Sequence, residues 1–302
     1  MDKPVKIRPR AITPEWAGQK ASLLPLLTVS RRGFVAAGIG SGFALAVLPV
    51  MAAAIKTDSE GLVAGEVKIP VADGEIPGYR AMPTAGGPFA AVLVIHEIFG
   101  VHEHIQDLCR RLAKRGYFAV APAIYARHGD VTKMSSVGEI VDNVVSKVPD
   151  AQVTADLDAT AAWAQKTGDA DTARLGVTGF CWGGRQVWLY AERNPRVKAG
   201  VAWYGQLRGT QTKLRPEWPL DVALRLKVPV LGLYGGKDSG IPLSDVDAMR
   251  AALRKGKSGS EIRLYPDAPH GFNADYRPSY RAEDAKDAWG RMLAWFKDHG
   301  VA

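Results

Sequence analysis

The segment Gly179-Phe-Cys-Trp-Gly-Gly184 constrains the fold of this 302-residue chain more than any other. It follows an apolar, strand-like run and precedes a helical pattern. This order of strand, tight turn and helix matches the G-x-S-x-G nucleophile elbow, with Cys181 in the place of the serine. Such an elbow holds its nucleophile in a strained backbone conformation, and side chains at Gly179 and Gly183 would collide with neighbouring elements. The pattern predicts a cysteine nucleophile at a helix N-terminus, where the helix dipole favours a thiolate.

Strand-like and helix-like segments alternate along the rest of the chain. The expected strands are an N-terminal hairpin at 65–72 and 78–83, followed by 89–96, 117–124, 174–179, 197–204, 229–235 and 260–265. The expected helices are 102–115, 150–167, 183–193, 243–256 and 281–298. Residues 125–149 and 206–227 show no regular pattern. Alternation of this kind predicts an α/β protein with a mostly parallel central sheet and helices on both faces, as a single domain over 55–302.

A cysteine nucleophile needs a base, and the base needs an acid that orients it. In elbow-type enzymes the three follow in the order nucleophile, acid, base. Asp238 lies in a glycine-rich turn after one expected strand, and His270 lies in a Pro/Gly loop after the next. Both positions fall at the carboxyl ends of parallel strands, where open α/β sheets place their sites. The sequence therefore predicts a triad of Cys181, Asp238 and His270. Three weaker candidates for the acid are Asp245, Asp247 and Asp267.

The N-terminal segment, residues 1–54, differs from the rest in charge and pattern. With seven Lys/Arg and two acidic residues it holds +5 of the formal net charge of +8, so the remainder gives little support for a nucleic-acid partner. Ser30-Arg-Arg-Gly-Phe-Val35 resembles a twin-arginine export motif, and Ala52-Ala-Ala54 resembles a cleavage site. The apolar run 34–50 contains glycines and Pro49, and so makes a poor membrane span.

Three interpretations of this segment are open: a cleaved leader, a retained membrane anchor, and a basic tail with a buried helix. We expect the leader, and hence a periplasmic or secreted protein that is membrane-tethered if the leader is retained. No stable membrane span is then expected in the mature chain. The protein is expected to be a monomer or a small homo-oligomer.

Four segments together resemble the dienelactone hydrolase family, which comprises carboxymethylenebutenolidase-type enzymes with the α/β-hydrolase fold. They are the cysteine elbow at 179–184, His96-Glu-Ile-Phe-Gly100, Ala121-Pro-Ala-Ile-Tyr-Ala-Arg127 and His270-Gly-Phe272. The similarity spans residues 60–300. It implies hydrolysis of a carboxylic ester or lactone through an acyl-enzyme on Cys181.

The resemblance also implies roles for residues around the nucleophile. Glu97 would lie beside the resting thiol and take its proton when substrate binds, which would protect the thiol from oxidation in the absence of ligand. His96 stands where other members have glutamine, and hydrogen bonding to the backbone is the alternative to a direct catalytic role. The backbone N–H groups of Ile98 and Trp182 would form the oxyanion hole.

The arginines bear on the nature of the substrate. Arg127 matches a family arginine that binds a substrate carboxylate, so an anionic ester or lactone is expected. The family's second such arginine, four residues after the catalytic histidine, is replaced here by Ala274. Arg277 and Arg281 are candidates for its role. This departure weakens the case for dienelactone itself more than the case for hydrolysis.

The remaining predictions concern the residues that line the substrate pocket, the binding of a metal or cofactor, and the state of Cys109. Phe99, Tyr125 and Phe272 are predicted to line the substrate pocket, with core packing as the alternative. The sequence contains no metal-binding or dinucleotide pattern, so neither a metal nor a cofactor is expected. Cys109 falls in a helical pattern and reads as a buried thiol, with a disulfide to Cys181 as the alternative.

Two other classes of function remain open. A hydrolase of the same fold can act on a different small acyl substrate, such as an aryl ester, a thioester or a short peptide. A non-catalytic binding protein built on this fold, or a membrane-tethered interaction protein, is the other class. A substrate panel separates the first from a lactonase, and the presence of all three triad residues argues against the second.

Overall fold

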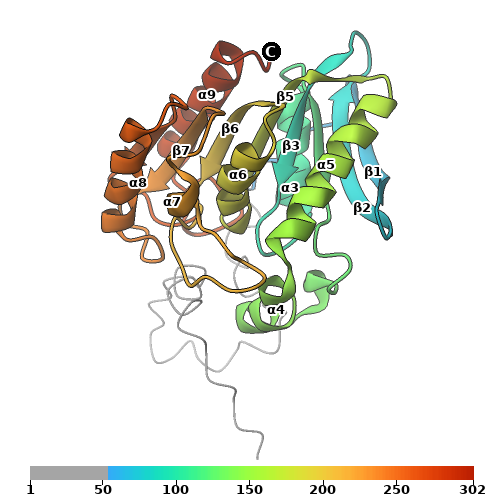
Figure 1. Ribbon diagram of the computed structural model, residues 1–302. Coiled ribbons are helices and arrows are strands. Elements are labelled where there is room, and N and C mark those ends of the chain that lie inside the picture. The colour runs from blue at the N-terminus through green and yellow to red at the C-terminus, as the bar shows by residue number, and fades with distance from the viewer. Residues whose placement is uncertain (1–53) are drawn as a thin grey trace, which may run out of the picture.

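Eight strands form one sheet in the computed structural model, which describes residues 54–302 (Figure 1). The strands are β1 (Leu62–Val71), β2 (Gly74–Pro83), β3 (Phe89–Ile95), β4 (Phe118–Pro122), β5 (Ala170–Phe180), β6 (Val197–Trp203), β7 (Val230–Gly235) and β8 (Glu261–Tyr265). Their order across the sheet is β1-β2-β4-β3-β5-β6-β7-β8. β2 pairs antiparallel with β1 and β4, and every other pair of neighbours is parallel. The predicted α/β-hydrolase fold is therefore confirmed.

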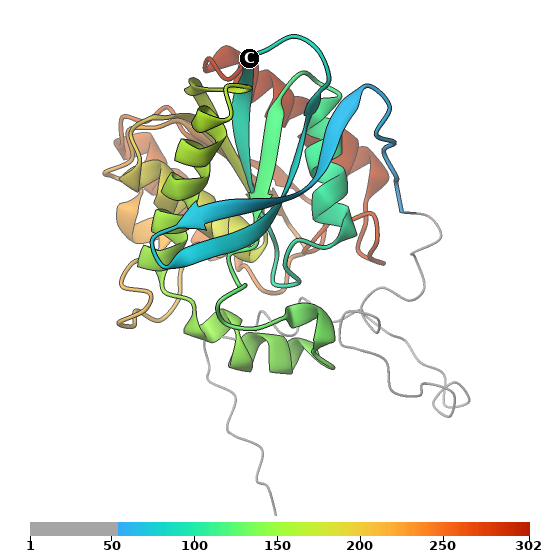
Figure 2. The same cartoon turned by 90° about the vertical axis from the view of Figure 1, so that its right-hand side faces the viewer.

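Helices cover both faces of this sheet. They are α3 (Glu103–Ala113), α4 (Val137–Asn143), α5 (Asp150–Lys166), α6 (Trp182–Arg193), α7 (Pro219–Val222), α8 (Leu243–Lys255) and α9 (Ala282–Asp298). Two short 3₁₀ turns, η2 (Val131–Lys133) and η3 (Val145–Lys147), flank α4. α5 and α6 lie on one face, and α3 and α9 lie on the other (Figures 1 and 2). This layering explains why the central strands read as continuous apolar runs, since both of their faces are buried.

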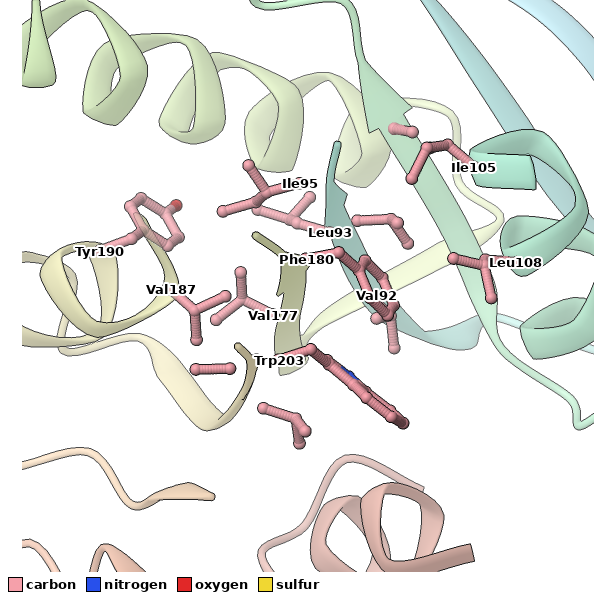
Figure 3. Close-up of a cluster of buried hydrophobic side chains, with 14 of the residues drawn as sticks. Val92, Leu93, Ile95, Ile105, Leu108, Val177, Phe180, Val187, Tyr190 and Trp203 are labelled. Atoms are coloured by element: carbon pink, nitrogen blue, oxygen red, sulfur yellow. The ribbon is translucent and has the colours of Figure 1, made fainter. Parts of the chain in front are cut away.

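The core lies where β3, β5 and β6 meet the helices on either side. Figure 3 shows side chains from these strands, such as Val92 and Val177, packed with Ile105 and Leu108 of α3 and with Val187 of α6. These five side chains are fully buried. Each buried aliphatic side chain of this size contributes about 1.5–3 kcal/mol relative to an exposed one. The strand ends that carry the candidate site are therefore set in a closely packed frame.

Residues 125–149 differ from the expectation of an irregular stretch, because they contain α4 and both 3₁₀ turns. The Ser136 side chain caps α4 by accepting a hydrogen bond from the Glu139 N–H (3.1 Å). Ser136-Val-Gly-Glu139 is an S-x-x-E sequence, which is a helix-start signal that the sequence analysis overlooked. The second stretch, 206–227, likewise contains the short helix α7.

The predictions for the N-terminal segment fall almost wholly on residues 1–53, outside the described part of the chain. In residues 54–302, none of the helices is both long enough and apolar enough to cross a membrane. Cys109, buried in α3, and Cys181 are both free thiols. The disulfide considered between them is therefore absent from the structure.

Candidate active site

Cys181 connects the end of β5 to the start of α6. Its backbone angles are φ 55° and ψ −115°, a left-handed conformation that is costly for any residue with a side chain. The Cys181 N–H donates a hydrogen bond to the Trp203 carbonyl at the end of β6 (3.0 Å), which fixes the turn against the neighbouring strand. The sulfur is thereby held beside the first turn of α6, where the helix dipole favours the thiolate.

Three glycines allow this turn to pack closely against its neighbours. A Cβ on Gly179 would lie 2.5 Å from the Gly183 carbonyl oxygen. A Cβ on Gly183 would lie 2.3 Å from the Ile95 carbonyl oxygen, and one on Gly184 would lie 2.4 Å from that of Trp203. All three obstacles are backbone atoms, which cannot move aside as a flexible side chain can. The elbow therefore requires glycine at these positions.

The loops after β7 and β8 bring Asp238 and His270 together. His270 Nδ1 and Asp238 Oδ2 are 2.7 Å apart, and both side chains are buried. The second oxygen of Asp238 accepts a hydrogen bond from the Gly240 N–H (2.8 Å). The orienting acid is thus held from two directions. The weaker acid candidates Asp245, Asp247 and Asp267 form ion pairs with Arg208, Arg250 and Lys237, respectively.

The charge state of His270 depends on Asp238 and Cys181. Burial alone would lower the pKa of His270, but the charges and hydrogen bonds of Asp238 and Cys181 raise the pKa to about 10. A positively charged His270 and the Asp238 carboxylate attract each other strongly in a buried site. The three predicted triad residues therefore lie together in the order acid, base, nucleophile.

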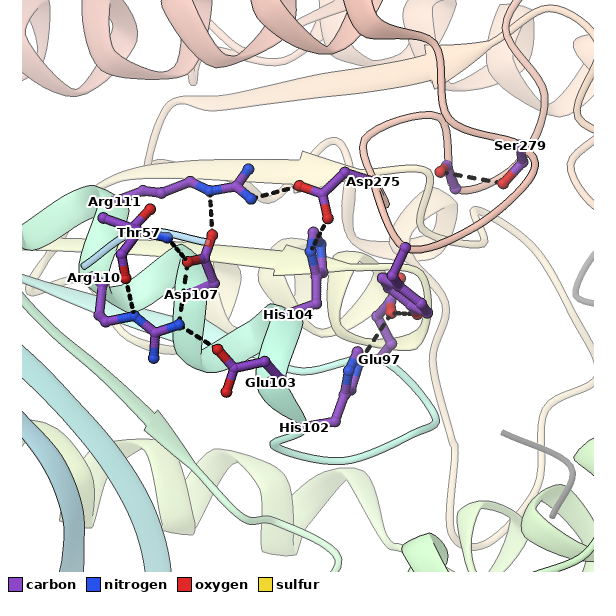
Figure 4. Close-up of polar contacts among 12 residues, drawn as sticks. Thr57, Glu97, His102, Glu103, His104, Asp107, Arg110, Arg111, Asp275 and Ser279 are labelled. Atoms are coloured by element: carbon purple, nitrogen blue, oxygen red, sulfur yellow. Dashed lines mark hydrogen bonds and ion pairs between the residues drawn. The ribbon is translucent and has the colours of Figure 1, made fainter. Parts of the chain in front are cut away.

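Glu97 follows β3 and is completely buried. Its Oε2 accepts a hydrogen bond from the Tyr276 hydroxyl (2.5 Å) and lies 3.5 Å from His102 Nε2 (Figure 4). Burial alone would raise the pKa of Glu97, but the contact with His102 and the charges of His102, His104 and Arg277 lower the pKa to about 2. Glu97 is therefore a carboxylate at neutral pH.

Glu97 and Cys181 share their surroundings. Burial raises the pKa of Tyr125 and of Tyr204 well above the ordinary value, and the charges of Glu97 and Cys181 raise both further. Neither phenol hydroxyl has a hydrogen-bond partner within residues 54–302. Tyr204 is one of two described residues other than glycine with positive φ (39°), and its ring lies 5.1 Å from that of His270. Two unpartnered hydroxyls near a nucleophile are suited to binding polar atoms of a substrate.

Both ring nitrogens of His96 form hydrogen bonds with backbone groups in this structure. Its Nε2 accepts a hydrogen bond from the Ile124 N–H (3.2 Å), so the proton resides on Nδ1, which donates to the Glu97 carbonyl (2.8 Å). Burial lowers the pKa of His96 to about 4, so the ring is neutral. His96 therefore links the end of β3 to the segment after β4, in agreement with the backbone alternative for this residue.

The predicted oxyanion donors, the N–H groups of Ile98 and Trp182, make no backbone hydrogen bond within the described residues. They follow β3 and Cys181, respectively, as the prediction requires. Their role stays a prediction, since no bound oxyanion is present to receive them.

Arg127 is occupied by carboxylates. Its Nη2 donates to both oxygens of Asp156 (2.6 and 2.5 Å), and its Nη1 lies 3.3 Å from Asp73. Two acids thus pair with this guanidinium, and its role as an anchor for a substrate carboxylate stays a prediction. Sequence reasoning could not anticipate this pairing, because Asp156 lies 29 residues away on α5.

The two arginines that could take the role of the arginine missing at Ala274 lie in different places. Arg277 is buried, and one of its guanidinium nitrogens lies 3.0 Å from the point where a Cβ on Gly271 would be. Arg277 therefore lies next to the loop of His270. Arg281 is half-exposed and pairs with Asp284 (3.6 Å). Of the two, Arg277 is the one near the candidate site.

The predicted pocket aromatics, Phe99, Tyr125 and Phe272, are all buried, and Tyr125 also lines a cavity. Phe272 packs among Trp203, Tyr204 and Tyr265, so its contacts are those of a core residue. Phe99 contacts the His102 ring (6.1 Å between centroids). Tyr125 lies with His96 along one wall of a cavity of about 450 Å³.

This cavity separates the β2 strand from the segment 123–132. Trp182, which follows the nucleophile, lies 4.9 Å from the Tyr125 ring and 5.7 Å from that of His96. The cavity is thus one layer of aromatic rings away from the elbow. It offers room for part of a small organic substrate.

Sequence reasoning missed a polar network that reaches Glu97 from α3 (Figure 4). Asp275 accepts from Arg111 (2.5 Å) and lies 3.2 Å from His104. Arg111 also donates to Asp107 (2.5 Å), which in turn accepts from the Thr57 N–H (2.6 Å). The only sequence signal was the unusual pair of histidines at the start of an amphipathic helix. In the part of the chain that the structure describes, no group of acids, histidines and cysteines is arranged to hold a metal ion.

Comparisons with known proteins point to one family. Residues 76–300 match the dienelactone hydrolase family. The chain is 61% identical over 282 residues to a protein of Methylorubrum extorquens named "Putative carboxymethylenebutenolidase", covering 93% of this chain and 97% of that one. It is 51% identical to the protein of the same name in Escherichia coli, over 86% of this chain and 96% of that one.

A solved structure is similarly close. The crystal structure titled as a putative dienelactone hydrolase from Klebsiella pneumoniae has a TM-score of 0.77 and 54% sequence identity to this chain. The match covers 78% of this chain and 98% of that one.

Proposed function

Since this chain belongs to the dienelactone hydrolase family and is an ester or lactone hydrolase of that type, we propose that it acts through an acyl-enzyme on Cys181. The observation that carries the proposal is the buried Cys181–His270–Asp238 group at a strained elbow. Nucleophile, base and orienting acid are the parts that acyl transfer needs.

The proposed reaction proceeds in two stages. Glu97 accepts the thiol proton, and the thiolate attacks the substrate carbonyl carbon while the backbone N–H groups of Ile98 and Trp182 bind the oxyanion. The carbon–oxygen bond then breaks, and the leaving oxygen takes a proton from the His270 imidazolium. In the second stage His270 accepts a proton from water, whose oxygen attacks the thioester and releases the acid. Glu97 finally returns its proton to the sulfur.

The identity of the substrate is the finer part of the proposal. The cavity beside Tyr125 and His96 offers room for part of a small carboxylic ester or lactone. An anionic substrate would be bound by Arg277 rather than by Arg127, because Asp156 and Asp73 already neutralise Arg127. The same occupied arginine favours a second candidate function, hydrolysis of a different small acyl substrate such as an aryl ester or a thioester.

The decisive test uses Cys181→Ala and, as a matched control, Cys109→Ala. Cys181→Ala is expected to abolish turnover of small activated esters while keeping the far-UV circular dichroism of the wild type. Cys109→Ala is expected to retain turnover, because that thiol is buried in α3 away from the elbow. Hydrolysis by Cys181→Ala at the wild-type rate would refute the mechanism.

A substrate panel then separates the two candidate functions. Matched esters and lactones with and without a carboxylate are compared by kcat/KM in the wild type and in Arg277→Gln. Preference for the anionic members that disappears in Arg277→Gln supports an anionic substrate. Equal use of both members supports the neutral acyl substrate.

We also propose that the chain is exported through the twin-arginine route. Support comes from the sequence of residues 1–54 alone. Intact-mass measurement of the protein recovered from the periplasm tests the proposal. A mass that includes residues 1–54, or recovery only from the cytoplasm, contradicts it. Replacing Arg31 and Arg32 with lysine is the matched control, and it is expected to block export.

A further inference from the structure

The two oxygens of Glu97 have different surroundings. Oε2 accepts the hydrogen bond of Tyr276 (2.5 Å) and faces His102 (3.5 Å). Oε1 is buried and has no hydrogen-bond partner within residues 54–302. An unpartnered oxygen on a buried carboxylate costs free energy, so an arrangement that retains one calls for a structural or functional reason.

We propose that Tyr276 and His102 are positioning residues for Glu97, which bind its Oε2 and leave Oε1 as the acceptor for the Cys181 proton. The proposal rests on the acyl-enzyme function proposed above. In the step concerned, the S–H bond breaks and an O–H bond forms on Oε1, while the electron pair stays on the sulfur. Only a carboxylate that is held at one oxygen and open at the other can do this without losing its orientation.

Tyr276 is itself held in place by its neighbours in the chain. Asp275 binds Arg111 and His104 of α3, and the buried Arg277 lies beside Gly271. The loop that carries Tyr276 is therefore tied to α3 on one side of that residue and packed against the His270 loop on the other.

His102 lies at the start of α3. It occupies the N-cap position, yet its side chain makes no capping hydrogen bond. Its ring instead lies 5.0 Å from that of Tyr276, with the two rings nearly perpendicular. The two partners of Glu97 therefore pack against each other.

The charge of Glu97 depends on these partners. The titratable and charged groups around it are His102 and His104 at the start of α3, Tyr276 and Arg277 in the loop after β8, and Tyr125, Tyr204 and Cys181. Burial, the largest influence, acts to raise the pKa of Glu97, and the contact with His102 and the charges of His102, His104 and Arg277 outweigh it. When Tyr276 and His102 are replaced, burial becomes the dominant influence on the pKa of Glu97. The pKa of Glu97 then rises, and the carboxylate becomes protonated at a higher pH than in the wild type.

The experiment measures kcat/KM for a neutral p-nitrophenyl ester from pH 4 to pH 8. This ratio reports the essential groups of the free enzyme. The variants are Tyr276→Phe, His102→Ala, His102→Gln and the double variant Tyr276→Phe/His102→Ala. In the wild type Glu97 stays ionised throughout this range, because its pKa is about 2.

In the double variant we expect a new acid limb, with its midpoint moved upward by about one pH unit or more relative to each single variant. Tyr276→Phe alone keeps the aromatic ring and is expected to shift in the same direction by less. His102→Gln retains an N–H donor and is expected to recover part of the loss seen in His102→Ala. Tyr280→Phe, which removes a hydroxyl from the same loop without touching Glu97, is the control and is expected to match the wild type.

A uniform fall in kcat/KM at every pH, with no new limb in any variant, would overturn the proposal and assign both residues a purely structural role. If the double variant does not fold, Tyr276→Phe carries the test. Failure of the proposed function is separately visible, since it shows as hydrolysis by Cys181→Ala. An inactive Cys181→Ala together with unshifted profiles would reject the positioning role alone.

Discussion

Replacing Gly183 with alanine tests the elbow where its packing is tightest. The added methyl group would lie 2.3 Å from the Ile95 carbonyl oxygen, 2.7 Å from the His96 carbonyl oxygen and 2.8 Å from the Ile95 carbonyl carbon. Cβ atoms in proteins essentially never approach other atoms closer than 3.0 Å. The start of α6 and the end of β3 would therefore have to separate by several tenths of an ångström.

The energetic cost follows from this separation. Overpacking a well-packed site costs about 1–3 kcal/mol, and backbone obstacles place this site near the upper value. Alanine returns at most about 1 kcal/mol through its better helix propensity. The net loss of stability is then about 2 kcal/mol, which corresponds to a fall in Tm of roughly 4–8 °C for a domain of this size.

The matched control is Gly290→Ala in α9, because a Cβ at Gly290 meets no atom within 4 Å. That variant gains the helix propensity without the collision, so it is expected to be up to about 1 kcal/mol more stable than the wild type. Both variants are measured by urea unfolding and by hydrolysis of an activated ester. Displacement of Cys181 from His270 is expected to lower kcat/KM of Gly183→Ala by roughly 100-fold, since misplacement of about 1 Å has that effect. If Gly183→Ala matches Gly290→Ala in stability and rate, the elbow is not constrained by this contact and the reasoning fails.

Two further predictions concern charges. Arg111→Leu leaves the buried carboxylates of Asp107 and Asp275 without their shared partner, so urea unfolding is expected to show a loss in the free energy of unfolding of about 3 kcal/mol. The control, Arg291→Leu, breaks an exposed pair with Asp287 and is expected to lose less than about 1 kcal/mol. Equal losses in the two variants would contradict the buried network. The pKa of His270 is raised to about 10 from 6.5, so its protonated form stabilises the fold fully below pH 6.5 and that contribution is lost as pH rises through 10. Stability measured from pH 6.5 to 10 should fall more steeply in the wild type than in Asp238→Asn, and parallel curves would refute the pairing.

The sequence could predict that Cys181, Asp238 and His270 lie at one edge of the sheet, because each of them follows a strand. The carboxyl ends of parallel strands meet at one edge of the sheet, so the order Cys181, Asp238, His270 carried spatial information. The elbow glycines could be predicted for a similar reason, since the collision they avoid lies within the strand–turn–helix unit and its neighbouring strands.

Partners that come from elsewhere in the fold could not be predicted. Arg127 was expected to bind a substrate carboxylate, and its ion pair with Asp156 of α5 was not anticipated. Tyr276 was not singled out, because a tyrosine six residues after His270 has no pattern that points to Glu97, 179 residues away. The α4 helix was missed for a different reason: its capping signal at Ser136 was present but short.

The loop from Gly271 to Arg277 is buried along its whole length, whereas Pro278 is exposed. Most loops lie at the surface and tolerate changes of length. In this loop, Asp275 faces α3, Tyr276 faces Glu97 and Arg277 lies beside Gly271. Inserting or deleting a single residue between Gly271 and Asp275 would move all three out of register at once. Insertions near this site are therefore expected to be tolerated only from Pro278 onward, and grafted loops or engineered lids have to be joined there.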